Sequence, residues 1–150
     1  MGATLWRPYF LALLAEGYGQ VGAADEGLRV LVEALAAVQH TDERLWEAEL
    51  HRLTGELMLQ ARPQYLVPGN DLSHTAEAEA CLYQALAVAR RQQAQSWELR
   101  AAISLSRLWQ RQGKQREARA LLAPVYGWFT EGFDTADLQE AKALLEELGG

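Results

Sequence analysis

Apolar and small residues recur at spacings of three and four along this chain, which is the pattern of amphipathic helices. The clearest copy runs from Trp97 to Val125, where one such set precedes Gly113 and another follows it. The first set is Ala102, Leu105, Ser106 and Trp109, and the second is Ala118, Leu122 and Val125. Glycine between the sets ends a helix without a Cβ clash. The stretch therefore predicts two antiparallel helices joined at Gly113.

Two earlier stretches repeat this pattern position by position. The first has Leu11, Leu14, Ala15 and Tyr18, then Gly22, then Gly27, Leu31 and Ala34; the middle one has His51, Thr54, Gly55 and Met58, then Ala78, Leu82 and Ala85. Ala15 and Gly55 are 40 positions apart, and Gly55 and Ser106 are 51 apart, of which 11 belong to an insertion in the middle copy. A fixed period of this kind is typical of stacked helical hairpins.

We therefore expect an all-α chain, folded over residues 1–150 as one domain of three hairpins and a C-terminal capping helix. The hairpins cover about 4–40, 42–93 and 96–130, and the capping helix covers 134–148. Turn-forming residues predict a loop insertion at 62–73. Expected helix starts are Thr41 or Asp42, Ser73 or Thr75, Ser96, and Asp134 or Thr135. Pro8 fits only a first helical turn, and Pro124 predicts a kink or an interruption.

The order of small, aromatic and glycine or alanine positions resembles the tetratricopeptide repeat (TPR). Leu14, Ala15, Tyr18, Gly22, Leu31 and Ala34 follow that motif, as do Leu105, Ser106, Trp109, Gly113, Ala118, Leu122 and Val125. The period of 40 exceeds the usual ~34, and Gln39 stands where the closing proline is customary. The resemblance implies a right-handed superhelical stack that binds other proteins.

The longer repeat is similar to the C-terminal TPR regions of large bacterial regulators, namely signal-transduction ATPases and class III adenylate cyclases. The segments AEAEACLYQALAVARRQ, SWELRAAISLSRLW and ARALLAPVYGWFTEGFDTADLQEAKALLEEL carry this likeness. It implies a non-enzymatic protein–protein interaction module, the sensing or scaffold part of a larger signalling or transcription regulator.

Composition narrows the partners that we expect. A net charge of −6 disfavours nucleic-acid binding, and no run reaches the ~18 apolar residues of a membrane span. The start, MGATLWRPYF, lacks a secretory pattern, and the single cysteine, Cys81, leaves no internal disulfide. We expect a cytoplasmic protein whose partner is a protein or peptide. Residues 90–119 hold eight basic side chains against two acidic ones, so an acidic or carboxylate-terminated partner is the specific expectation.

In the predicted stack, the first helix of each hairpin lines a groove. The groove positions that we single out for a partner are Arg52, Glu56, Arg100, Arg107 and Arg111, because arginine on a rigid helix holds a carboxylate bidentately. Glu49, Leu53, Ile103 and Ser104 fall on the same predicted faces. The same charges also fit a solvated surface network, and both interpretations stay open.

The first helix, from about Thr4, is apolar nearly all round, with Trp6, Tyr9, Phe10 and Leu13 beyond its inner face. Such a helix is buried on more than one side. Two interpretations stay open. Either the chain continues a longer solenoid, or this helix makes a homodimer, in which case the protein is a self-associating structural domain.

No catalytic, cofactor-binding or metal-ligating residue is predicted. Glu47 and His51 are four apart on one helix face, but a hydrogen-bonded pair explains them better than a metal site. Cys81 beside Leu82 predicts a packed thiol over a reactive one. Four tryptophans, Trp46, Trp97, Trp109 and Trp128, are expected in the repeat core.

Overall fold

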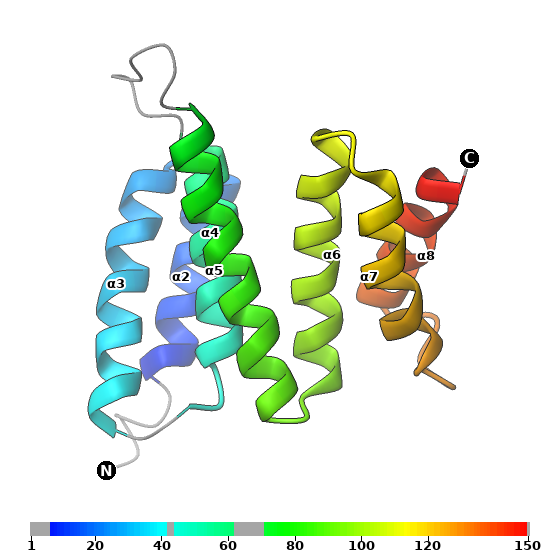
Figure 1. Ribbon diagram of the computed structural model, residues 1–150. Helices are drawn as coiled ribbons and strands as arrows, with labels where there is room; N and C mark the ends of the chain where they lie inside the picture. The colour runs from blue at the N-terminus through cyan, green and yellow to red at the C-terminus, as the bar shows by residue number, and fades with distance from the viewer. Residues whose placement is uncertain (1–6, 42–43, 62–70, 150) are drawn as a thin grey trace. The chain divides into compact units, whose positions relative to one another are not determined.

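The computed structural model describes residues 7–41, 44–61 and 71–149, and within them every regular element is an α-helix. The seven helices described are α2 (Arg7–Gln20), α3 (Ala24–Thr41), α4 (Glu47–Gln60), α5 (Asp71–Arg91), α6 (Gln95–Arg111), α7 (Gln115–Gly127) and α8 (Ala136–Gly149), shown in Figure 1. The all-α prediction is confirmed for this part of the chain. None of these helices is both long and apolar enough to cross a membrane.

Contacts divide the chain into two compact units, Met1–Ala85 and Leu86–Gly150, and α5 contributes to both. In the first unit, α2 and α3 form a hairpin against which α4 packs. Its buried core consists of Ala12, Ala15, Ala24, Leu31, Ala34, Val38, Leu50, Leu53 and Leu57. In the second unit, α6 and α7 form a hairpin and α8 packs against both.

Small residues let the paired helices cross closely. The Ser106 hydroxyl of α6 donates a hydrogen bond to the Ala118 carbonyl of α7 at 3.2 Å. A Cβ built on Gly27 would lie 3.1 Å from the Ala15 carbonyl oxygen, and one built on Gly55 would lie 2.9 Å from that of Ala78. The three small-residue pairs that the sequence pattern picked out therefore do lie at close crossings.

Three helices end in the same way, with a residue in the left-handed conformation followed by a hydrogen bond back into the last turn. Gly22 after α2 and Gly113 after α6 both have φ of 80°, and the next amides bond to the carbonyls of Tyr18 and Trp109 at 2.8 Å. These two ends confirm the predicted breaks. The third end, after α5, places Gln93 at φ 53°, and it was not predicted from the sequence because glycine is the usual residue at such a position.

Several predicted helix starts are wrong. Thr41 is the last residue of α3, and α4 begins at Glu47 after an uncapped Trp46, with Glu47 and Glu49 near the positive end of the helix dipole. Asp42 lies outside the described residues. Ser96 lies inside α6, which starts at Gln95, since the left-handed turn after α5 sets that start without a side-chain cap.

The helix after the insertion begins earlier than predicted, and the last helix begins as predicted. Asp71 opens α5, so Ser73 and Thr75 lie within it. Of the loop predicted at 62–73, residues 71–73 are therefore helical, and 62–70 lie outside the described residues. The His74 ring nitrogen Nε2 hydrogen-bonds to the carbonyls of Met58 and Ala61, which ties α5 to the end of α4. The carbonyl of Thr135 accepts the first helical bond of α8, from Gln139 at 3.0 Å.

The two prolines fit their helices for different reasons. Pro8 lies in the first turn of α2, where its missing N–H is not needed. Pro124 does not interrupt α7, which runs on to Gly127. Pro124 and Ala120 are both exposed, so the carbonyl that loses its helical donor faces water. That exposure explains why the helix continues through the proline.

Candidate functional site

Three arginines follow one side of α6, and two of them meet carboxylates of α8. Arg100 Nε lies 3.6 Å from Asp137 Oδ1, and Arg107 Nε donates to Glu140 Oε1 at 2.9 Å. We call Arg100, Arg107 and Arg111 the arginine face. The sequence predicted that these arginines share a helix face, but it did not identify their α8 partners, because the register of α8 on α6 is a tertiary property.

The members of the arginine face differ in how firmly they are held. Arg100 is partly covered, and its guanidinium carbon lies 5.9 Å from the centroid of the Trp97 ring. The side chains of Arg107 and Glu140 are 39% and 44% exposed, so water screens their attraction. Arg111 is exposed and donates its Nε proton to the Arg107 carbonyl at 3.4 Å. Within the described residues no carboxylate is paired with Arg111.

The remaining predicted groove positions lie elsewhere or are covered. Ile103 and Ser104 on α6 are buried, as are Glu49 and Leu53 on α4. Residues on the wall of an open groove would be exposed, so these four positions do not line one. The exposed, charged part of α6 is therefore the arginine face alone, and Ile103 and Ser104 do not belong to it.

Arg52 and Glu56 belong to the first unit, and Arg52 is held there by Glu49. Arg52 Nε donates to Glu49 Oε2 at 2.8 Å and its terminal nitrogen lies 2.6 Å from Oε1, a bidentate pair. Glu56 Oε1 lies 3.7 Å from the other terminal nitrogen of Arg52. Burial would lower the pKa of Arg52, but the hydrogen bond and charge of Glu49, with the charges of Glu56 and Glu16, raise it. The Arg52 guanidinium is therefore already paired with carboxylates of its own helix, α4.

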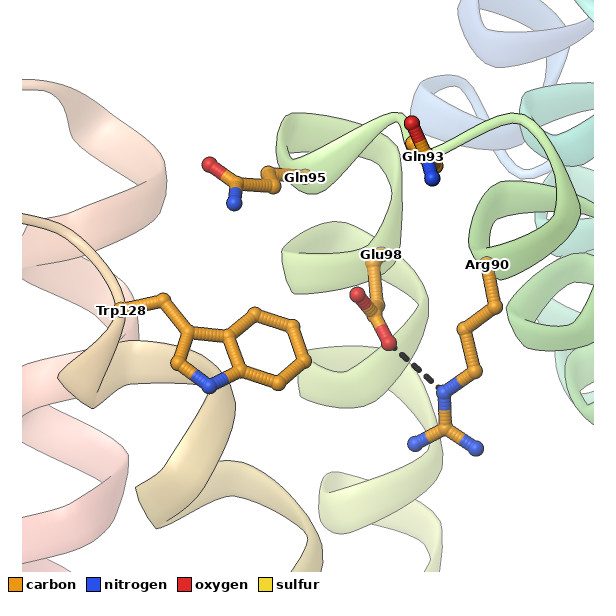
Figure 2. A pocket seen from close by; sticks show the side chains of 5 residues that line it. All are labelled: Arg90, Gln93, Gln95, Glu98 and Trp128. Atoms are coloured by element: carbon orange, nitrogen blue, oxygen red, sulfur yellow. Dashed lines mark hydrogen bonds and ion pairs between the residues drawn. The ribbon is translucent and has the colours of Figure 1, made fainter.

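A pocket of about 520 Å³ opens in the second unit, lined by Arg90, Gln93, Gln95, Glu98 and Trp128. Figure 2 shows the Trp128 indole on one side, Arg90 on the other side, and Glu98 of α6 between them. Arg90 Nε donates to Glu98 Oε1 at 2.6 Å. We call these five residues the Trp128 pocket.

The sequence did not predict this pocket, and the prediction for one of its lining residues, Trp128, was wrong. Trp128 was expected in the core but is 49% exposed. The apolar spacing that leads from Ala118 to Val125 extends to Trp128, yet α7 ends at Gly127, so the periodicity no longer applies there. The sequence does repeat a Trp-Glu pair, at Trp46-Glu47 and Trp97-Glu98, and in the structure each of these glutamates contacts an arginine.

The predicted self-association residues divide into covered and open ones. The Tyr9 ring packs on Trp46 at a centroid distance of 4.8 Å, whereas Phe10 and Leu13 are exposed. Trp6 lies outside the described residues. Leu14, predicted on the inner face, is exposed instead, because the buried side of α2 runs through Ala12 and Ala15.

Two other candidate groups are engaged in local contacts. His51 Nε2 lies 3.8 Å from Glu47 Oε1, and the residues that the structure describes contain no group of three or more metal-ligating side chains. The Cys81 thiol lies 3.8 Å from the Met58 sulfur. Burial raises its pKa, with a smaller contribution from Glu77.

Comparisons of this chain with protein-family models, with curated proteins and with solved structures gave no match.

Proposed function

We propose that this protein is a non-enzymatic protein–protein interaction module built as a TPR-like, right-handed superhelix of three hairpins and a capping helix. The support at the level of fold is the close crossing at Ala15–Gly27, Gly55–Ala78 and Ser106–Ala118. The same small residues carry the sequence resemblance to TPRs. A role as the sensing or scaffold part of a larger cytoplasmic bacterial regulator follows from that resemblance and is part of the proposal.

The observation that carries the binding role is the arginine face. Three cationic side chains lie along one side of a single helix, within one compact unit. Exposed ion pairs such as Arg107–Glu140 contribute only about 0–1 kcal/mol. A partner carboxylate can therefore replace Glu140 at little cost, and Arg111 presents a guanidinium without a carboxylate to displace.

The ligand proposed is an acidic peptide, or one that ends in a free carboxylate. Arginine forms bidentate hydrogen bonds to carboxylates, and a helix holds successive arginines at a fixed separation. The affinity should fall as the salt concentration rises, because salt screens the attraction between exposed charges, with a screening length of ~10 Å at 0.1 M ionic strength.

A peptide array tests this proposal directly. Wild-type protein should prefer acidic peptides, and the Arg100→Ala/Arg107→Ala double variant should lose that preference. The Lys114→Ala/Arg116→Ala double variant is the matched control, since it removes the same charge from exposed positions outside the arginine face. Equal binding by all three proteins, or a preference for basic peptides, would rule the proposal out.

Self-association through α2 is a second candidate function, favoured by one observation. Phe10 is 63% exposed, and Leu13 and Leu14 are about half exposed on neighbouring turns of the same helix. Spacings of three and four bring these side chains together on the helix surface. A contiguous apolar strip of this kind is typical of a contact surface, and a second copy of α2 would cover it.

A further inference from the structure

We propose that the Trp128 pocket binds a carboxylate that is attached to an apolar group, with Arg90 holding the carboxylate and the Trp128 indole covering the apolar part. This site uses none of the arginine face and goes beyond the function proposed above. Its volume, about 520 Å³, falls within the ~300–1,000 Å³ of small-ligand pockets.

The hydrogen-bond donors left open in the pocket favour an anionic ligand. Glu98 is buried, with its side chain 6% exposed, and it accepts the Nε proton of Arg90. A guanidinium carries five N–H donors, so four remain on the two terminal nitrogens of Arg90. The arginine side chain is 52% exposed, which leaves these donors accessible. A cationic ligand would instead lie beside a like charge.

The ion pair also fixes the direction of Arg90. The buried Glu98 carboxylate accepts the Nε proton at 2.6 Å and so orients the planar guanidinium. Figure 2 shows both terminal nitrogens pointing away from Glu98. A donor fork that is oriented before binding loses less side-chain freedom when a carboxylate arrives. Glu98 is in this sense a positioning residue.

The other walls favour an apolar group beside a polar one. Trp128 follows the last residue of α7 and lines the pocket, and Figure 2 shows its large apolar indole extending toward the side where Glu98 and Arg90 lie. Gln93 and Gln95 add amides that both donate and accept hydrogen bonds. Gln93 keeps a left-handed backbone that glycine would adopt more easily, and such strain is often found at binding sites.

Two sources supply this chemistry, the free C-terminus of a peptide with an apolar last residue and a small organic acid. The test titrates the full chain with N-acetyl-phenylalanine, its amide N-acetyl-phenylalaninamide, 3-phenylpropanoate and acetate. The readout is the indole N–H resonance of Trp128 in ¹⁵N spectra, assigned with the Trp128→Phe variant. The two aromatic acids should shift this resonance saturably, and the amide and acetate should bind at least about tenfold more weakly.

Paired variants of neighbouring arginines isolate the contribution of Arg90. Arg90→Gln should weaken binding of N-acetyl-phenylalanine at least about tenfold, whereas Arg91→Gln, an exposed neighbour outside the pocket, should leave it unchanged. If Arg90→Gln fails to fold because Glu98 loses its cation, Arg90→Lys keeps the charge but not the fork, and should still bind severalfold more weakly.

Each outcome decides the proposal. Tighter binding of N-acetyl-phenylalanine than of 3-phenylpropanoate supports it with a peptide terminus as ligand, and equal or tighter binding of 3-phenylpropanoate supports it with a small organic acid. Equal affinity of the acid and its amide, equal losses in the Arg90 and Arg91 variants, or a Trp128 resonance that stays unmoved at millimolar ligand would overturn it. None of these results depends on the arginine face.

Discussion

At the scale of single residues, the closest contacts involve the smallest side chains. Ala118 is fully buried where α7 crosses α6, and its carbonyl accepts the Ser106 hydroxyl. No larger side chain fits between backbones that approach this closely. The identity of these residues is set by the distance between the helix axes, which is why they were visible in the sequence as a period.

Replacing Ala118 with leucine should therefore overpack the α6–α7 crossing. We expect the free energy of unfolding to fall by about 1–3 kcal/mol, measured by urea or thermal unfolding. Ala120→Leu is the matched control, because Ala120 lies on the exposed side of the same helix. Equal stability of the two variants would mean that the small residue at 118 is not required by packing.

Cys81 leads to a prediction about pH. Burial raises the pKa of its thiol, and Glu77 adds to the shift, so at any pH near neutrality less thiolate is present than in an ordinary cysteine. Since the thiolate is the reactive form, iodoacetamide should modify native Cys81 more slowly than the unfolded chain. The native rate should rise only at a higher pH than the unfolded rate does. Matching rate profiles for native and urea-unfolded protein would contradict this.

At the scale of helices, the sequence predicted the buried faces of the helices better than the residues at which the helices begin. The faces of α3, α7 and α8 follow from periodicity, because a buried strip must repeat every three or four residues. The starts of α4 and α6 did not follow, because neither has a side-chain N-cap. The Trp128 pocket was missed for a related reason, since Arg90 and Glu98 come from different helices and meet only through the turn at Gln93.

The contact of α6 with α8 gives a prediction that links stability to binding. Glu140→Gln removes an exposed pair with Arg107, so unfolding free energy should fall by less than about 1 kcal/mol. The same change frees Arg107, so affinity for an acidic peptide should rise. Calorimetric titration of the wild type and of the Glu140→Gln variant with an acidic peptide measures the two affinities.

Its control is Glu131→Gln, which removes an exposed carboxylate outside α8. An acidic peptide that binds the Glu140→Gln and Glu131→Gln variants equally well would show that Arg107 is not the group that Glu140 and the ligand share.

At the scale of the whole molecule, each compact unit presents a different surface. The first unit exposes the apolar strip of α2, and the second carries the arginine face and the Trp128 pocket. Association and ligand binding are therefore separable by mutation. A variant that changes one surface should leave the other intact, as long as its own unit folds.

Self-association is the property to measure first at this scale. If α2 forms a homodimer, sedimentation velocity should show the mass rise with protein concentration. Phe10→Asp together with Leu13→Asp should return a monomer of unchanged helicity, because both side chains are exposed. Val32→Asp together with Leu45→Asp, exposed apolar positions outside α2, is the control. A wild type that stays monomeric at all concentrations would exclude the homodimer.

The close crossing at Gly55 has a consequence for how this protein can evolve. A Cβ there would meet the carbonyl oxygen of Ala78 at 2.9 Å, and also the Leu82 side chain. A smaller residue at Leu82 relieves only the second clash. No substitution at Ala78 relieves the first, because every residue keeps its carbonyl. Gly55 therefore has no single compensating partner, and related sequences should vary around it while the glycine itself stays fixed.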